Sequence, residues 1–145
     1  MYGNWFEFIA IQCIQARAAF FVIMVPLKVV SKLFRFNDEQ LPASLRSQRI
    51  LNKARIPEIS RYITENPDEY ILSSLCATVD DEVHFEAIGN TEGLKSIGKL
   101  RIPMTATVLI NDGQHRKAAI EEAIRERAYL GDETISVVLF VDKCV

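Results

Sequence analysis

The residues best suited to chemistry lie together in one short segment, Asn111 to Lys117, which reads Asn-Asp-Gly-Gln-His-Arg-Lys. The segment follows an apolar, β-branched run at 105–110 and precedes a helical pattern at 114–129. A strand that runs into a helix leaves the backbone N–H groups of the first helical turn without partners, and the helix dipole adds a partial positive charge there. Such a junction binds anions, so the segment predicts a phosphate site.

Four residues of this segment are expected to contact the phosphate: Gly113, His115, Arg116 and Lys117. Glycine has no Cβ and lets an anion approach the backbone closely. The guanidinium of Arg116 can bind a phosphate through two parallel hydrogen bonds. Basic residues at a helix N-terminus oppose the dipole and cost roughly a few tenths of a kcal/mol each. Their presence here therefore favours a bound anion.

Asp112 has two interpretations that the sequence leaves open. As an N-cap it would accept hydrogen bonds from the first helical turn. As a functional group it would orient Arg116 or hold a ribose or a metal ion. Nucleotide hydrolysis would need Mg²⁺, a positioned water and a base. Asp112 is the candidate carboxylate for that reaction, and Gln114 is the candidate for orienting the water.

Several other kinds of site are excluded by their patterns. The segment contains neither GxxxxGK[ST] nor GxGxxG, so it is not a P-loop or a dinucleotide-binding loop. His84 and His115 are far apart and the chain has no CxxC pair, so no structural metal is expected. Three cysteines, Cys13, Cys76 and Cys144, are odd in number and share no short spacing. This usage predicts no disulfide framework and a reducing, cytoplasmic location.

Length and hydropathy favour one domain without a membrane span. The chain has 145 residues, of which 49% are hydrophobic and 25% charged, a composition typical of a globular domain. The apolar run at 18–27 is half the length of about 20 residues that a spanning helix needs. We therefore predict buried strands there and no contact with a membrane.

Charge is sorted unevenly along the chain. Residues 44–61 carry five basic and one acidic side chain, and residues 93–117 carry the same numbers. Between them, residues 64–92 carry eight acidic and no basic side chains. The two basic segments could converge on a nucleotide or a DNA backbone, with Arg46, Arg49 and Lys53 as candidate DNA contacts. The alternative is that these are solvated faces that happen to segregate.

The periodicity predicts a mixture of strands and helices without strict alternation, which defines the α+β class. Strands are expected at 6–14, 19–25, 69–79, 83–87, 105–110 and 135–141, and the third and fourth are expected to form a hairpin around Asp80 and Asp81. Helices are expected at 45–54, 56–66 and 114–129, with a turn at 37–42. Residues 27–36 are a short helix or extended.

The run DGQHR, Asp112 to Arg116, resembles the signature of the DGQHR-domain family. Within it the chain resembles DndB proteins, regulators of bacterial DNA phosphorothioation. The supporting stretches are 41–63, 100–124 and 131–142, together well over half the chain. DndB proteins are longer, so the resemblance implies that residues 1–145 are a single domain forming the N-terminal portion of a longer protein.

The same junction is similar to one in ParB-type proteins and in sulfiredoxin, which implies a ParB/sulfiredoxin-like mixed sheet with flanking helices and a bound nucleotide triphosphate. The matching positions for phosphate contact are Gly113, His115 and Arg116. The lysine that meets ATP in sulfiredoxin falls near Arg55, with Lys53 or Arg49 as alternatives. Gln114 stands where sulfiredoxin has its catalytic cysteine, so reduction of a sulfinic acid is excluded at this position.

Two functions from different classes follow from the resemblance. One is a repressor that binds promoter DNA of the sulfur-modification genes, tuned by ATP or another nucleotide triphosphate with Mg²⁺. The other is a DNA-stimulated nucleotide triphosphatase in DNA modification or restriction. A weaker third is a module that contacts the other modification proteins through the apolar N-terminal segment, whose aromatic residues are otherwise core (Trp5, Phe6, Phe8, Phe20, Phe21). A homo-oligomer is also expected, since DNA-binding regulators are often dimers.

Overall fold

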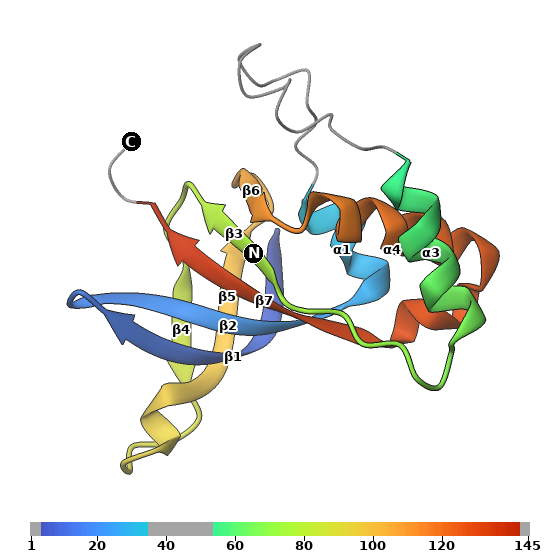
Figure 1. The fold of residues 1–145 in the computed structure, drawn as a ribbon. Helices are drawn as coiled ribbons and strands as arrows, with labels where there is room; N and C mark the ends of the chain where they lie inside the picture. The colour runs from blue at the N-terminus through green and yellow to red at the C-terminus, as the bar shows by residue number, and fades with distance from the viewer. Residues whose placement is uncertain (1–3, 35–53, 143–145) are drawn as a thin grey trace.

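The computed structural model describes residues 4–34 and 54–142, which form one mixed sheet and three α-helices (Figure 1). The strands are β1 (Trp5–Gln15), β2 (Ala18–Pro26), β3 (Leu75–Val79), β4 (His84–Ala87), β5 (Ile97–Pro103), β6 (Val108–Asp112) and β7 (Thr134–Val141). The α-helices are α1 (Leu27–Leu33), α3 (Arg55–Glu65) and α4 (Gln114–Glu126), with short 3₁₀ turns η2 (Leu94–Ser96) and η3 (Ala128–Asp132). The α+β class is confirmed.

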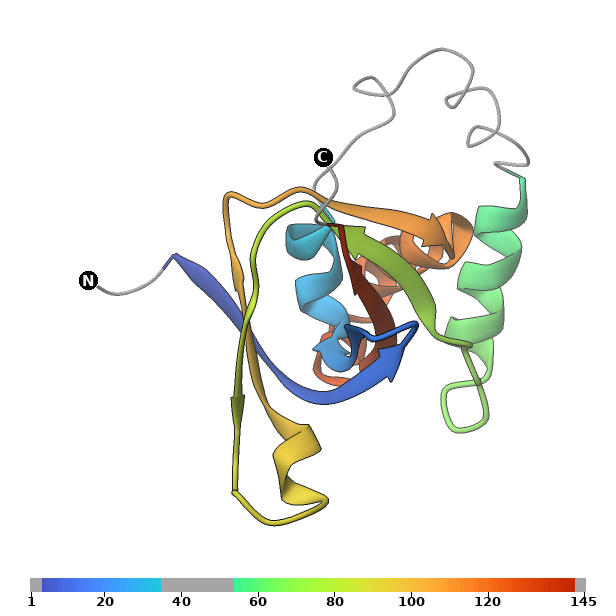
Figure 2. The same cartoon turned by 90° about the vertical axis from the view of Figure 1, so that its left-hand side faces the viewer.

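The sheet has the strand order β4-β5-β1-β2-β7-β3-β6. Only β3 and β7 pair in parallel; the other neighbours are antiparallel. The sheet is strongly curved (Figure 2). Phe21 of β2 and Phe85 of β4 have ring centroids 5.6 Å apart although β5 and β1 lie between their strands in the sheet. The curve therefore brings the edge strand β4 over the inner face of β2.

One face of the sheet and the helices share a single core, because side chains alternate along each strand. In β2, Phe21, Ile23 and Val25 are buried, whereas Met24 between them is exposed. The same core contains residues from all three helices, including Val30, Ile63 and Ile120. Of the aromatic residues predicted to be core, Phe8 and Phe21 are buried in it and Phe6 packs against it. No described helix is long and apolar enough to cross a membrane.

The outer face of the sheet is apolar and partly exposed. One row of registered residues crosses five strands, and its members are Ile97, Ile11, Val22, Val138 and Cys76. A second row, Cys13, Phe20 and Phe140, crosses β1, β2 and β7, with the two phenylalanine rings stacked at 5.2 Å. The aromatic segment is thus divided: Phe8 and Phe21 are buried, and Trp5 and Phe20 lie on the outer side.

The predicted hairpin of the third and fourth strands is wrong. β3 pairs with β6 and β7, and β4 pairs with β5. The loop after β3 is held instead by Asp80, whose backbone N–H donates to the oxygen of Thr107 and whose carboxylate accepts from the Thr107 N–H. These bonds fasten β3 to β6, and the chain then leaves for the opposite edge of the sheet.

Two predicted strand boundaries also shift. The strand predicted at 69–79 is regular only over 75–79, and the one predicted at 105–110 covers Val108–Asp112 instead. A turn at Pro103, where the N–H of Ala106 bonds to the Pro103 oxygen, delays the start of β6. Residues 27–33 are helical, so of the two predictions for this segment, a short helix or extended chain, the helix is observed. The turn at 37–42 and most of the helix predicted at 45–54 lie outside the described residues.

Candidate functional site

β6 passes into α4 through a single residue, Gly113, which has φ +109° and ψ +20°. This left-handed conformation disfavours residues with a Cβ. A Cβ built on Gly113 would lie 2.4 Å from Cδ2 of Leu75 and 3.0 Å from Nη2 of Arg116. The side of Gly113 expected to admit an anion is therefore packed against the protein's own side chains, and the glycine is required for that packing.

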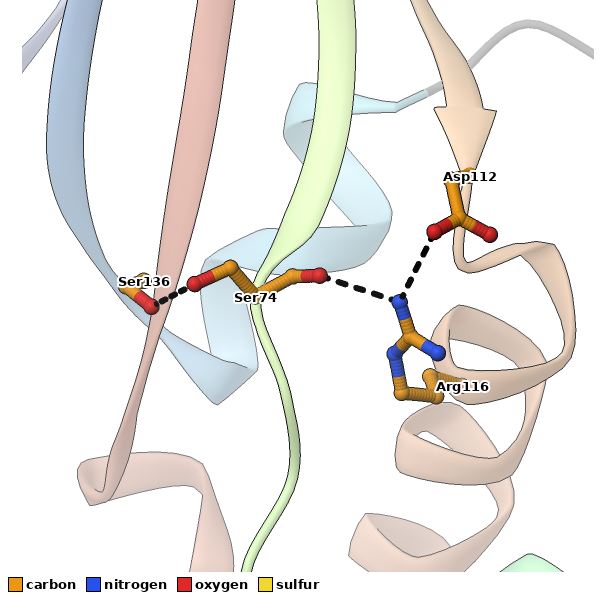
Figure 3. A network of polar contacts seen from close by, with 4 residues as sticks. All are labelled: Ser74, Asp112, Arg116 and Ser136. Atoms are coloured by element: carbon orange, nitrogen blue, oxygen red, sulfur yellow. Dashed lines mark hydrogen bonds and ion pairs between the residues drawn. The ribbon is translucent and has the colours of Figure 1, made fainter.

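Arg116 lies across the junction and ties it to β3 (Figure 3). Its Nη2 donates to the backbone oxygen of Ser74 at 2.9 Å and lies 3.8 Å from Oδ2 of Asp112. The Arg116 side chain is 23% exposed, and its Nε is buried without a hydrogen-bond partner. The hydroxyl of Ser74 in turn bonds to the hydroxyl of Ser136 on β7, so the contacts run over three segments of the chain.

Asp112 is not an N-cap. It is the last residue of β6, and the N-cap position of α4 is Gly113, with no side-chain capping bond. The carboxylate of Asp112 instead faces Arg116, four residues ahead, and is 80% exposed. Of the two interpretations, orientation of Arg116 agrees with the structure and capping does not. The strand continues through Asp112 because Cys76 of β3 pairs with it.

The basic charge of the first turn is largely offset by nearby carboxylates. Lys117 Nζ lies 3.5 Å from Oε2 of Glu121, and Arg116 is paired with Asp112. Both pairs place a carboxylate beside a cation, and the Lys117–Glu121 pair, four residues apart on α4, contributes about 0.3–0.5 kcal/mol. They relieve the cost that these cations have at a helix N-terminus. The argument that a bound anion must offset this cost is therefore weaker than the sequence indicates.

The backbone of the first turn keeps the character of an anion site. The first helical bond in α4 runs from the Lys117 N–H to the Gly113 oxygen. The three residues before Lys117 have no helical carbonyl for their N–H groups, and the first turn contains no acidic residue. The side-chain amide of Gln114 turns back to donate to the Ile110 oxygen at 3.2 Å, which fixes its nitrogen away from solvent.

The structure brings the DGQHR residues together and places Arg55 on another helix. Asp112, Gly113 and Arg116 are in mutual contact, and Gln114, His115 and Lys117 share the same half-buried turn. Arg55 is exposed at the start of α3, a separate helix that packs against α4. The DNA-contact candidates Arg46, Arg49 and Lys53 lie outside the described residues, as does Cys144. Ser74 and Leu75, which the sequence did not indicate, are part of the junction.

No group of three or more potential metal-binding side chains occurs within residues 4–34 and 54–142. Cys13 and Cys76 are free and half-buried on the outer face of the sheet.

The described chain is thus an α+β protein in which a strand, β6, meets a helix, α4, at a left-handed glycine. A family model described as DndB, DNA-sulfur modification-associated, matches residues 8–145. The chain belongs to the DndB family, which implies a role in DNA sulfur modification.

No curated protein and no solved structure matches the chain. The expected likeness to ParB-type proteins and sulfiredoxin therefore stays a prediction.

Proposed function

We propose that this chain is a regulator of DNA sulfur modification that binds promoter DNA and represses the modification genes, with a phosphate or nucleotide site at the first turn of α4. The family membership supports the biological setting. The observation that carries the site is that α4 begins at a left-handed glycine with no side-chain cap and no acidic residue in its first turn. The N-terminus of a helix, with its dipole and its outward-pointing backbone N–H groups, suits a phosphate.

In this proposal His115, Arg116 and Lys117 surround the phosphate, with Arg55 as a contributor from α3. Gly113 takes part by giving the start of α4 its left-handed geometry, since its open side is packed against Leu75 and Arg116. Arg116 has a double role, because its Nη2 is already engaged by Ser74 and Asp112. It holds the junction in shape and adds positive charge. The ligand is ATP or another nucleotide triphosphate with Mg²⁺.

Calorimetric titration with ATP, CTP and GTP, with and without Mg²⁺, tests the site. We expect saturable binding by the native chain and none by Arg116→Ala. Arg125→Ala is the matched control, since Arg125 lies in the last turn of the same helix. Lys117→Ala, which keeps the Ser74 bond, should weaken binding in a folded protein. If the native chain binds no nucleotide, the junction is not a nucleotide site.

Promoter binding is tested separately by gel retention of a modification-gene promoter against a shuffled duplex. Basic residues at Arg46, Arg49 and Lys53 would contact phosphates, so their replacement by Gln should weaken retention and reduce its dependence on salt. Equal retention of the two duplexes by the native chain would contradict a specific repressor.

The second candidate, DNA-stimulated nucleotide hydrolysis, is favoured by one observation: the Asp112 carboxylate is 80% exposed beside the Arg116 guanidinium. It could hold Mg²⁺ or act as base, while Gln114 would release Ile110 to orient a water. Phosphate release by Asp112→Ala and Gln114→Ala is the test. Unchanged turnover in both variants would exclude this assignment.

We also propose self-association or docking of another modification protein on the outer face of the sheet. The apolar row that contains Ile11 and Val22 supports this, because Ile11 is 48% exposed. Sedimentation of the native chain against Ile11→Glu measures it. A native chain that stays monomeric and binds none of the other modification proteins would contradict the proposal.

A further inference from the structure

A cavity of about 700 Å³ lies at the opposite end of β3 from the Gly113 junction. This volume is within the range of about 300–1,000 Å³ that is usual for ligand sites. Its lining residues are Gln12, Ala19, Phe21, Asp80, Asp81, Glu82, Val83, His84, Phe85, Val141 and Asp142. None of them belongs to the junction, so the cavity is a separate feature and does not depend on the function proposed above.

The floor of the cavity is apolar and aromatic. Phe21 is buried on β2, and its ring contacts that of Phe85 on β4 with centroids 5.6 Å apart. The cavity is thus lined from both β2 and β4, the two strands that the curve of the sheet brings toward each other. Phe85 is half-buried, and together with Val83 and Val141 it offers apolar surface to a ligand.

The rim of the cavity is acidic and contains no lysine or arginine among its lining residues. Asp80, Asp81 and Glu82 stand side by side in the loop after β3, and none of these three forms an ion pair with a described lysine or arginine. Asp80 anchors the start of the loop, because its carboxylate accepts from the N–H of Thr107, and the Asp81 carboxylate accepts from the N–H of the adjacent Glu82 at 2.7 Å. The rim is therefore a negative edge above an apolar floor.

The chemistry of this cavity selects against DNA and other anions and in favour of a cation with an apolar body. A planar guanidinium can stack on an aromatic ring and bond to carboxylates at its edge, which a compact ammonium does less well. We propose that the cavity is a docking site for an arginine-bearing peptide segment of a protein partner, with the guanidinium between the Phe85 ring and the Asp81 and Glu82 carboxylates.

Fluorescence anisotropy with a labelled peptide, Ala-Arg-Leu-Arg-Ala, tests the proposal. A second peptide with citrulline, the neutral isostere, in place of arginine isolates the charge. We expect the arginine peptide to bind saturably, and the citrulline peptide to bind about tenfold more weakly. The Asp81→Asn/Glu82→Gln variant should bind the arginine peptide about tenfold more weakly than the native chain does. Both carboxylates are replaced together because each exposed carboxylate contributes little alone. Asp80 is left unchanged, since it fastens the loop.

The matched control is Glu65→Gln/Glu126→Gln, which removes two exposed carboxylates at the ends of α3 and α4. This variant should bind like the native chain. Phe85→Leu, checked for folding by circular dichroism, should weaken the arginine peptide severalfold more than the citrulline peptide. Equal binding of both peptides, or equal loss in the control variant, would overturn the proposal.

The same cation chemistry could come from a small polyamine, so spermidine is the competitor. If displacing the labelled peptide takes a higher concentration of spermidine than of unlabelled peptide, the cavity prefers a peptide ligand. Displacement at lower concentration assigns the cavity to a small polyamine and overturns the peptide assignment.

Discussion

The guanidinium of Arg116 and the backbone oxygen of Ser74 are joined by a hydrogen bond of 2.9 Å that spans 42 positions of the sequence. It links the first turn of α4 to the residue just before β3. Arg116 is thus a structural residue of the junction as well as a candidate phosphate contact. The two roles can be separated by a substitution that keeps the charge and changes the geometry.

Arg116→Lys should retain most of the positive charge but lose the planar contact with both Ser74 and Asp112. Hydrogen bonds to charged groups contribute about 1.5–3 kcal/mol, and lysine recovers part of this. We expect the free energy of unfolding in urea to fall by about 1 kcal/mol, and Lys117→Arg to change it little. Arg116→Lys as stable as the native chain would show that the planar guanidinium is not needed for the stability of the junction.

Gly113→Ala should be among the most destabilising single changes at the junction. The new Cβ would meet Leu75 Cδ2 at 2.4 Å, in addition to the strain of a positive φ. Strain costs about 1–2 kcal/mol and overpacking about 1–3 kcal/mol, so we expect a loss of about 3 kcal/mol in the free energy of unfolding.

Gly93→Ala is the matched control for that loss. Gly93 also has a positive φ, +89°, but no heavy atom lies within 4 Å of its built Cβ. It should therefore show the strain alone, about 1 kcal/mol. The double variant Gly113→Ala/Leu75→Ala should lose less free energy of unfolding than the two single variants lose together, because Leu75→Ala removes the clash. Equal losses at Gly93 and Gly113 would contradict the packing argument.

Local patterns predicted the elements of this fold well where the chain alternates or repeats at helical spacing. Residues 19–25 and 135–141 are strands with one buried face, and the helix beginning at Gln114 is present. The pairing of the strands was not predictable from these patterns. Asp80 and Asp81 give the same turn signal whether the next strand folds back on β3 or crosses to β5, and the bonds of Asp80 to Thr107 decide between them.

The candidate site was predictable in position but not in its contacts. The residue types of Asn111 to Lys117 indicate a strand–glycine–helix junction, which is observed. The partner of Arg116 is a backbone oxygen, at Ser74, and backbone groups leave no residue-type signal. The acidic rim around Asp81 shows in the sequence only as charge, because the aromatic floor comes from Phe21, about 60 positions earlier.

The hydrogen bond between Tyr70 and Glu133 predicts a loss of stability at alkaline pH. Burial of Tyr70, together with the bond from its hydroxyl to the Glu133 carboxylate, raises the pKa of this phenol above its usual value of 10. The folded protein therefore keeps the Tyr70 proton at a pH where the unfolded chain has lost it. The stabilisation is complete below pH about 10 and decreases as the pH rises from there toward the folded pKa, at up to about 1.4 kcal/mol per pH unit.

Tyr70→Phe removes this proton and the bond to Glu133, so it should act in two ways. At pH 7 the free energy of unfolding should fall by about 1–2 kcal/mol, because the half-buried Glu133 oxygen loses its donor. Between pH 9.5 and 11 the variant should lose less stability than the native chain, so the two urea-unfolding curves should converge. Tyr129→Phe, at a residue that is 52% exposed and is the smallest of the causes that raise the pKa of Tyr70, should stay nearer the native curve than Tyr70→Phe does. Parallel pH dependences for Tyr70→Phe and the native chain would show that Tyr70 is not linked to folding through this proton.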